Sequence, residues 1–110
     1  MARYTNLFNT PERTQDRHRS IAEVLENCDL NLVYETKDYV VAQEKPGEVS
    51  YSQLATVEVL INPPTKDETH TKVNLVVKNE ELPLRAENHC QQVFEAVKRA
   101  ISAANYCVVA

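Results

Sequence analysis

One stretch decides the fold: residues 86–104, which read AENHCQQVFEAVKRAISAA. Its apolar side chains recur every three or four positions, so a helix with 3.6 residues per turn gathers them into one stripe. The members of this stripe are Cys90, Val93, Phe94, Val97, Ile101 and Ala104. Lys98 and Arg99 lie near the end of the stretch, as the helix dipole favours. The pattern predicts an amphipathic helix over 86–104 that covers a larger apolar surface.

In the middle of the chain the apolar period changes from 3.6 to 2, which is typical of β-strands. The alternation predicts four strands, at residues 30–35, 39–44, 50–61 and 71–78. The connections suit antiparallel neighbours, because Lys37-Asp38 fits a two-residue turn and Pro46-Gly47 lies in the next one. Two consecutive prolines place residues 62–68 in a loop, since neither a helix nor a central strand accommodates them.

The beginning of the chain predicts an arm followed by a helix. Residues 1–9 are expected to form the arm. Thr10, Pro11 and Glu12 then combine a hydroxyl cap, a first-turn proline and an acid, so a helix is predicted from Thr10 to about Asn27. Its apolar stripe is confined to the second half and consists of Ile21, Val24, Leu25 and Cys28. Only that half needs to contact a core.

The resulting order of elements is α-β-β-β-β-α. This order predicts an α+β two-layer sandwich, in which a four-stranded antiparallel meander carries the N-terminal and the C-terminal helix on one face. A chain of 110 residues is long enough for one core of this kind. We expect a single domain over residues 10–105, with the arm before it and an apolar C-terminal tail at residues 106–110.

The composition indicates which kinds of partner and which cellular compartment to expect. The net charge of −4 disfavours binding to nucleic acid. No stretch has the length and hydrophobicity of a signal peptide or a membrane span. The three cysteines, Cys28, Cys90 and Cys107, are widely spaced, which indicates reduced thiols. We therefore expect a cytoplasmic protein with no nucleic-acid partner and no membrane insertion.

The sequence offers two candidate surfaces for a partner. Residues 1–20 hold four arginines and two acidic residues and so have a net charge of +2, whereas the whole chain has a net charge of −4. This difference favours electrostatic docking of a partner at the N-terminal segment. Three of these four arginines, Arg13, Arg17 and Arg19, are taken as partner-binding residues. The sheet face turned away from the helices is expected to carry Val33, Val40, Ala42, Leu54, Leu60 and Val76. Scattered surface aliphatics are ordinary, but this face is more apolar than a solvated one, so Leu54, Leu60 and Val76 are taken as partner-binding residues.

No residue pattern indicates catalysis, a metal or a cofactor. His89 and Cys90 are neighbours that point about 100° apart on a helix, so they do not share a coordination face. Cys90 belongs to the buried stripe, where cysteine behaves as a small apolar residue. Glu80 and Glu81 have polar neighbours and are expected in a solvated loop rather than as an acid–base pair. We expect neither enzymatic activity nor a cofactor.

These observations favour a small non-catalytic protein-interaction module, an adaptor or regulatory subunit. Its partner would be another protein or a second copy of the chain in a homodimer. The alternative is a binding domain for a small apolar ligand, with a pocket between the C-terminal helix and the sheet lined by Phe94, Val97 and Ile101. That arrangement resembles the architecture of helix-grip lipid-binding domains.

Overall fold

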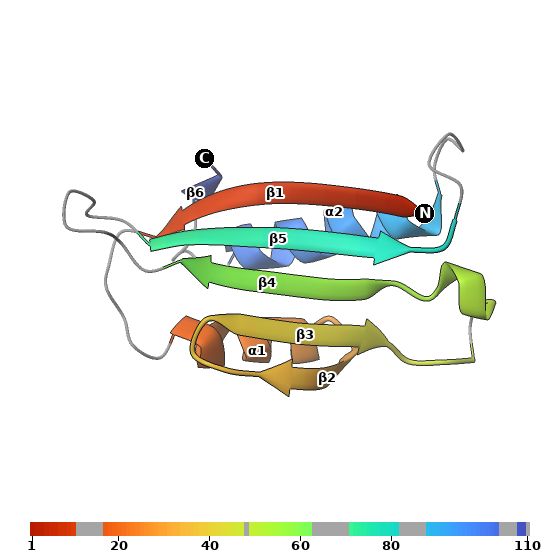
Figure 1. Ribbon diagram of the computed structural model, residues 1–110, viewed down its shortest axis with the longest axis horizontal. Helices are drawn as coiled ribbons and strands as arrows, with labels where there is room; N and C mark the ends of the chain where they lie inside the picture. Colours follow the sequence, from red (N-terminus) through yellow and green to blue (C-terminus); the bar gives the residue numbers. More distant parts are fainter. Residues whose placement is uncertain (11–16, 48, 63–70, 82–87, 104–107, 110) are drawn as a thin grey trace.

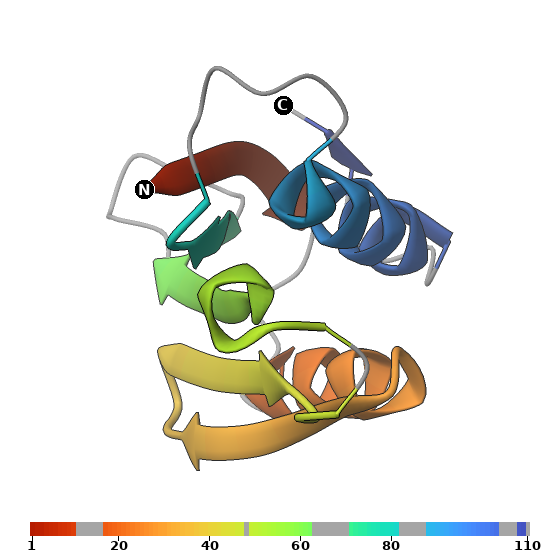
Figure 2. The same cartoon turned by 90° about the vertical axis from the view of Figure 1, so that its right-hand side faces the viewer.

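The computed structural model describes residues 1–10, 17–47, 49–62, 71–81, 88–103 and 108–109. They form one antiparallel sheet with two helices on one of its faces (Figure 1, Figure 2). Across the sheet the strands follow the order β2-β3-β4-β5-β1-β6. In chain order the elements are β1 (Ala2–Thr10), α1 (Arg17–Asn27), β2 (Leu30–Glu35), β3 (Tyr39–Glu44), the 3-10 helix η1 (Tyr51–Gln53), β4 (Thr56–Asn62), β5 (Thr71–Asn79), α2 (His89–Ala103) and β6 (Val108–Val109).

The predicted α+β class is confirmed, but the prediction of a four-stranded sheet is wrong. Strands β2 to β5 form the expected meander, β1 extends it beyond β5, and the two-residue β6 pairs with the end of β1. Residues 2–9 of the segment expected as an arm lie in β1, which pairs with β5 from Ala2↔Asn79 to Thr10↔Thr71. The partner of β1 lies far along the chain, so no local pattern marks this pairing.

Helix α1 packs on β2 and β3. Its apolar stripe faces the sheet as predicted, with these residues buried or half-buried: Ile21, Val24, Leu25 and Cys28. Thr10, the expected N-cap, is instead the last residue of β1, opposite Thr71, and residues 11–16 lie outside the described part of the chain. After the helix, Asp29 adopts a φ of 65°, a left-handed conformation that redirects the chain into β2.

Helix α2 packs on β5 and β1. Its buried residues belong to the predicted stripe and are Cys90, Phe94, Val97 and Ile101. The described helix begins at His89 because Asn88 caps it, with the Asn88 Oδ1 accepting the N–H of Gln91 at 2.7 Å. The ring of Phe94 stacks on Tyr4 of β1, with the ring centroids 5.6 Å apart. The predicted helix is therefore held against a strand that the sequence pattern did not reveal.

The core lies between the helices and the sheet and takes alternate residues from each strand. The buried members from β3, β4 and β5 are Val40, Ala42, Val57, Val59, Ile61, Val73, Leu75 and Val77. Val40 and Ala42 were expected on the opposite face, and that prediction is wrong. Residues 40–42 read Val-Val-Ala, so all three are apolar. By its sequence alone, this strand could turn either Val40 and Ala42 or Val41 towards the core. The pairing of Ala42 with Leu32 and Val57 selects the inward set and leaves Val41 on the other face.

Candidate interaction surface

The sheet face without helices is turned towards the viewer in Figure 1, and apolar residues of adjacent strands share this face. Strand register brings the members of one row together, because residues paired across antiparallel strands share a face. Tyr39 pairs with Leu60, Leu60 with Asn74, and Asn74 with Leu7. The adjoining row adds Tyr34, Val41 and Val76. We call this set the apolar band: Leu7, Tyr34, Tyr39, Val41, Leu60 and Val76.

Several members of the apolar band are open to solvent. The exposed fractions are 37% for Leu7, 39% for Leu60 and 52% for Tyr34. Exposed apolar residues scattered singly need no explanation, but here they belong to adjacent strands and rows. The band therefore crosses the sheet from β2 to β1 as one surface.

A hydrogen-bonded network links three strands on this face. The hydroxyl of Tyr39 donates to Glu58 Oε1 at 2.8 Å, and the ammonium of Lys78 lies 3.3 Å from the same oxygen. The hydrogen bond to Glu58 raises the pKa of Tyr39, and burial and the charges of Glu58 and Tyr34 add to the effect. The rings of Tyr34 and Tyr39 meet edge to face, with centroids 6.0 Å apart. The network joins β3, β4 and β5 and holds these side chains in place.

Basic side chains lie on both sides of the apolar band, towards the two ends of strands β1 and β5. The charged residues that the described strands place on this face are Arg3, Lys72, Lys78 and Glu58. This gives three basic groups against one acidic group, a local charge of +2 on a chain whose net charge is −4. Arg3 and Lys78 are directly opposite each other at one end, while Lys72 lies at the other end, between Asn9 and Asn62. The apolar band thus has a polar, mostly cationic border.

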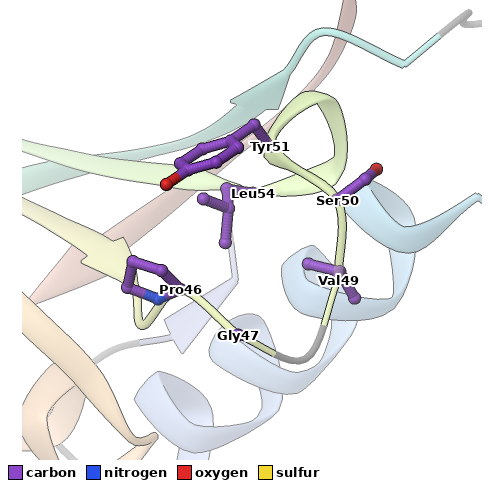
Figure 3. Close-up of a pocket in the computed structure, with 6 residues that line it drawn as sticks. All are labelled: Pro46, Gly47, Val49, Ser50, Tyr51 and Leu54. Atoms are coloured by element: carbon purple, nitrogen blue, oxygen red, sulfur yellow. The ribbon is translucent and has the colours of Figure 1, made fainter.

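The three apolar residues predicted to bind a partner do not form one patch. Leu60 belongs to the apolar band, and Val76 lies on the same face but is only 6% exposed. Leu54 lies before the start of β4, whereas Leu60 lies near its other end, so the two side chains are not neighbours. It lines a hollow of about 430 Å³, where Figure 3 shows it with Tyr51 and Pro46.

The predicted basic patch is not on this surface. Arg19 lies on α1, which covers the opposite face of the sheet, and its guanidinium is 2.5 Å from Glu35 Oε1. Arg17 is the first residue of α1, and Arg13 lies outside the described residues. The N-terminal residue that does reach the helix-free face is Arg3, which was not singled out because residues 1–9 were not predicted to form a strand.

The predicted ligand-pocket residues Phe94, Val97 and Ile101 are buried in the core, with exposed fractions of 7%, 1% and 0%. A groove of about 440 Å³ lies beside α2 rather than beneath it, and Val97 is the one residue of the three that lines it. The other lining residues come from α2, from the turn after α1 and the start of β2, and from the chain around the end of β3; they include Cys28, Leu30, Glu44, Val49, His89 and Val93.

The floor of this groove holds an imidazole–carboxylate pair. The Nε2 of His89 lies 2.7 Å from Oε1 and 2.8 Å from Oε2 of Glu44. Glu44 Oε1 also accepts the backbone N–H of Ala55 at 2.8 Å. The pair therefore links α2 to the end of β3 and to the segment before β4.

Glu81 is a buried polar residue that the sequence analysis misplaced. Glu80 is exposed as expected, but Glu81 is only 9% exposed and accepts the backbone N–H of Cys90 at 2.8 Å. Burial alone would raise the pKa of Glu81, but hydrogen bonds from Asn79, from the amides of Cys90 and His89 and from Gln53 lower it overall. Glu81 precedes His89, the first residue of α2, by eight residues, so no local sequence signal marks its contact with the helix.

The Cys90 thiol is protonated at neutral pH. Burial raises its pKa to about 11, and the charges of Glu81 and Glu44 contribute to the rise. A thiol of this kind is a poor nucleophile, because the thiolate is the reactive form. Cys90 fills the core, with its Sγ 3.5 Å from the carbonyl oxygen of Val77.

Among the described residues, no group of three or more histidine, cysteine or acidic side chains is placed to hold a metal ion. None of the helices in the described ranges is long and apolar enough to cross a membrane. No protein-family model matches the chain, and no curated protein matches it in sequence.

Proposed function

We propose that this protein is a non-catalytic protein-interaction module, an adaptor or regulatory subunit, which binds its partner through the apolar band. The observation that carries the proposal is the row from Tyr39 through Leu60 to Leu7, which crosses four strands with its apolar members partly exposed. Protein interfaces have an apolar centre, a polar border and an excess of tyrosine, and this face has all three features.

The proposed compartment is the cytoplasm. Cys28 and Cys90 are both free thiols in the structure. Free cysteines in a small domain are typical of reducing compartments, where disulfides do not persist.

The test is a single substitution in the centre of the apolar band. Leu60→Asp places a charge where an apolar partner surface would lie, so it should abolish capture of the partner from the native host lysate, measured by affinity capture and mass spectrometry. The matched control is Tyr51→Asp, because Tyr51 is 85% exposed but lies near the hollow at the other end of β4. Equal capture by the Leu60→Asp variant and the unmodified protein would contradict the proposal, provided that both are folded.

Binding of a small ligand in the groove beside α2 is a second candidate function. Its volume of about 440 Å³ is in the range of small-molecule pockets. The groove combines apolar side chains such as Val93 and Val97 with the polar pair His89 and Glu44, so a ligand with an apolar body and one polar group would suit it. Native mass spectrometry of freshly purified protein should then show a bound mass, which Val93→Trp should displace by filling the groove. Protein of unmodified mass in every preparation would argue against this function.

A further inference from the structure

We infer that the helix-free face binds an acidic partner protein, in which carboxylates surround an apolar centre. This inference rests on the proposed function and names the kind of partner that the surface fits. Its basis is the juxtaposition of the apolar band with Arg3, Lys72 and Lys78, which come from the first strand and the fifth strand of the chain.

The first step is the sign of the charge on this face. The charged residues of the described strands give this face a charge of +2, whereas the net charge of the chain is −4. The rest of the molecule therefore carries the negative charge. Complementary charge at the border of an interface speeds association and excludes partners of the wrong sign. An acidic partner is therefore attracted to this face and repelled by the rest of the molecule.

The second step is the contact between Arg3 and Lys78, which are directly opposite each other on β1 and β5. Like charges in this position destabilise a sheet. Glu58 offsets the charge of Lys78, but Arg3 makes no ion pair with any described residue. A carboxylate of the partner placed over Arg3 would relieve the repulsion, and the guanidinium can bind it through two parallel hydrogen bonds.

The third step is the distance between the two cationic ends. Lys72 and Lys78 are six residues apart on β5, which corresponds to about 20 Å. Leu60 and Val76 lie between these ends. A partner that uses both ends needs acidic groups about 20 Å apart with apolar side chains between them.

Two other occupants fit this face less well. A second copy that used the same face would bring three basic groups of each chain together, and Glu58 is the one acidic side chain that the described strands place on this face. A single-stranded nucleic acid needs open aromatic faces and basic neighbours, but the Glu58 carboxylate lies beside Tyr39. An acidic protein surface avoids both conflicts, because its carboxylates lie at the border and its apolar residues lie at the centre.

The experiment uses two synthetic peptides of about 14 residues, a helix length of about 20 Å, with leucines on one helical face. One peptide carries glutamates on both flanks of that face, and the other carries lysines. In NMR titrations of the full chain, the glutamate peptide should shift the amide signals of Arg3, Leu60 and Lys72. The Kd of this peptide should rise about tenfold when the ionic strength is increased from low to several times the physiological value. Stronger binding of the lysine peptide, binding of the glutamate peptide elsewhere, or no binding at millimolar concentration would overturn the inference.

Charge reversal gives the matched variants. Arg3→Glu combined with Lys72→Glu should weaken binding of the glutamate peptide at least about tenfold and should permit binding of the lysine peptide. Arg99→Glu is the control, because Arg99 is an exposed arginine on α2, on the covered side of the sheet. A single-stranded RNA oligonucleotide that binds this face more tightly than the glutamate peptide would also overturn the inference.

The inference and the proposed function fail in different ways. If Leu60→Asp abolishes partner capture but the double charge reversal leaves it unchanged at all salt concentrations, the acidic partner is excluded and the interaction module stands. If Leu60→Asp leaves capture unchanged, the proposed function itself is excluded.

Discussion

The carboxylate of Glu81 accepts the backbone N–H of Cys90 at 2.8 Å and so joins the segment after β5 to the first turn of α2. The same carboxylate accepts the N–H of His89 at 3.2 Å and the side-chain amide of Asn79 at 2.6 Å. The first N–H groups of a helix have no partner within the helix, and Glu81 supplies one. One buried acid therefore holds the start of α2 against the end of the sheet.

Removing this acid should destabilise the protein. Glu81→Ala leaves the amides of Cys90 and His89 and the side chain of Asn79 without their acceptor, so we expect a loss of about 2–3 kcal/mol in the free energy of unfolding. Urea unfolding followed by circular dichroism measures it. Glu80→Ala is the matched control and should change stability by less than about 0.5 kcal/mol, since Glu80 is exposed. Equal effects of the two substitutions would contradict the structural role of Glu81.

The lowered pKa of Glu81 also predicts a pH dependence. Its pKa in the folded protein is below its ordinary value of 4.5, so unfolding at intermediate pH takes up a proton. The stabilising contribution of Glu81 is therefore complete above about pH 4.5 and is lost as the pH falls through the folded pKa. Stability should decrease more steeply on acidification in the unmodified protein than in Glu81→Gln. Parallel pH profiles of the two proteins in urea unfolding would contradict this prediction.

A second pH effect concerns Tyr39 on the helix-free face. Its pKa is raised above the ordinary value of 10.0, first by the hydrogen bond to Glu58. The stabilisation linked to this shift is present below pH 10 and is lost as the pH rises through the folded pKa. Glu58→Gln removes the negative charge and should move the ionisation of Tyr39 to lower pH, as followed by ultraviolet absorbance. Tyr39→Phe should remove that transition and so identifies it in the spectrum.

The first strand should be essential to the fold. Phe8 is fully buried in β1, whereas its neighbour Leu7 is 37% exposed on the helix-free face. Phe8→Ala should therefore cost about 3–5 kcal/mol in the free energy of unfolding, because it leaves a cavity in the core. Leu7→Ala should cost less than about 1 kcal/mol. Similar losses for both variants would show that β1 does not contribute to the core as the structure places it.

The candidate surface could be predicted only in part. Leu60 was identified because it alternates with the buried residues of β4, and a local period is enough to place a residue on one face. Arg3, Leu7 and Lys72 could not be joined to it, because the register between β1, β5 and β4 brings them together. Val40 and Ala42 were misplaced, since a run of apolar residues fits either face until its neighbours pair with it.

Local patterns in the sequence determined the meander from β2 to β5 and the buried stripe of α2. Each of these depends on the spacing of apolar side chains within a few helical turns or a few strand residues. That spacing is a property of the sequence and does not require the tertiary structure. The tertiary structure alone decided that residues 2–10 form a strand beside β5, and that Glu81 caps α2. Both depend on partners distant in the chain or on burial. The stabilising free energy of these contacts therefore arises only after the sheet and the helix have come together.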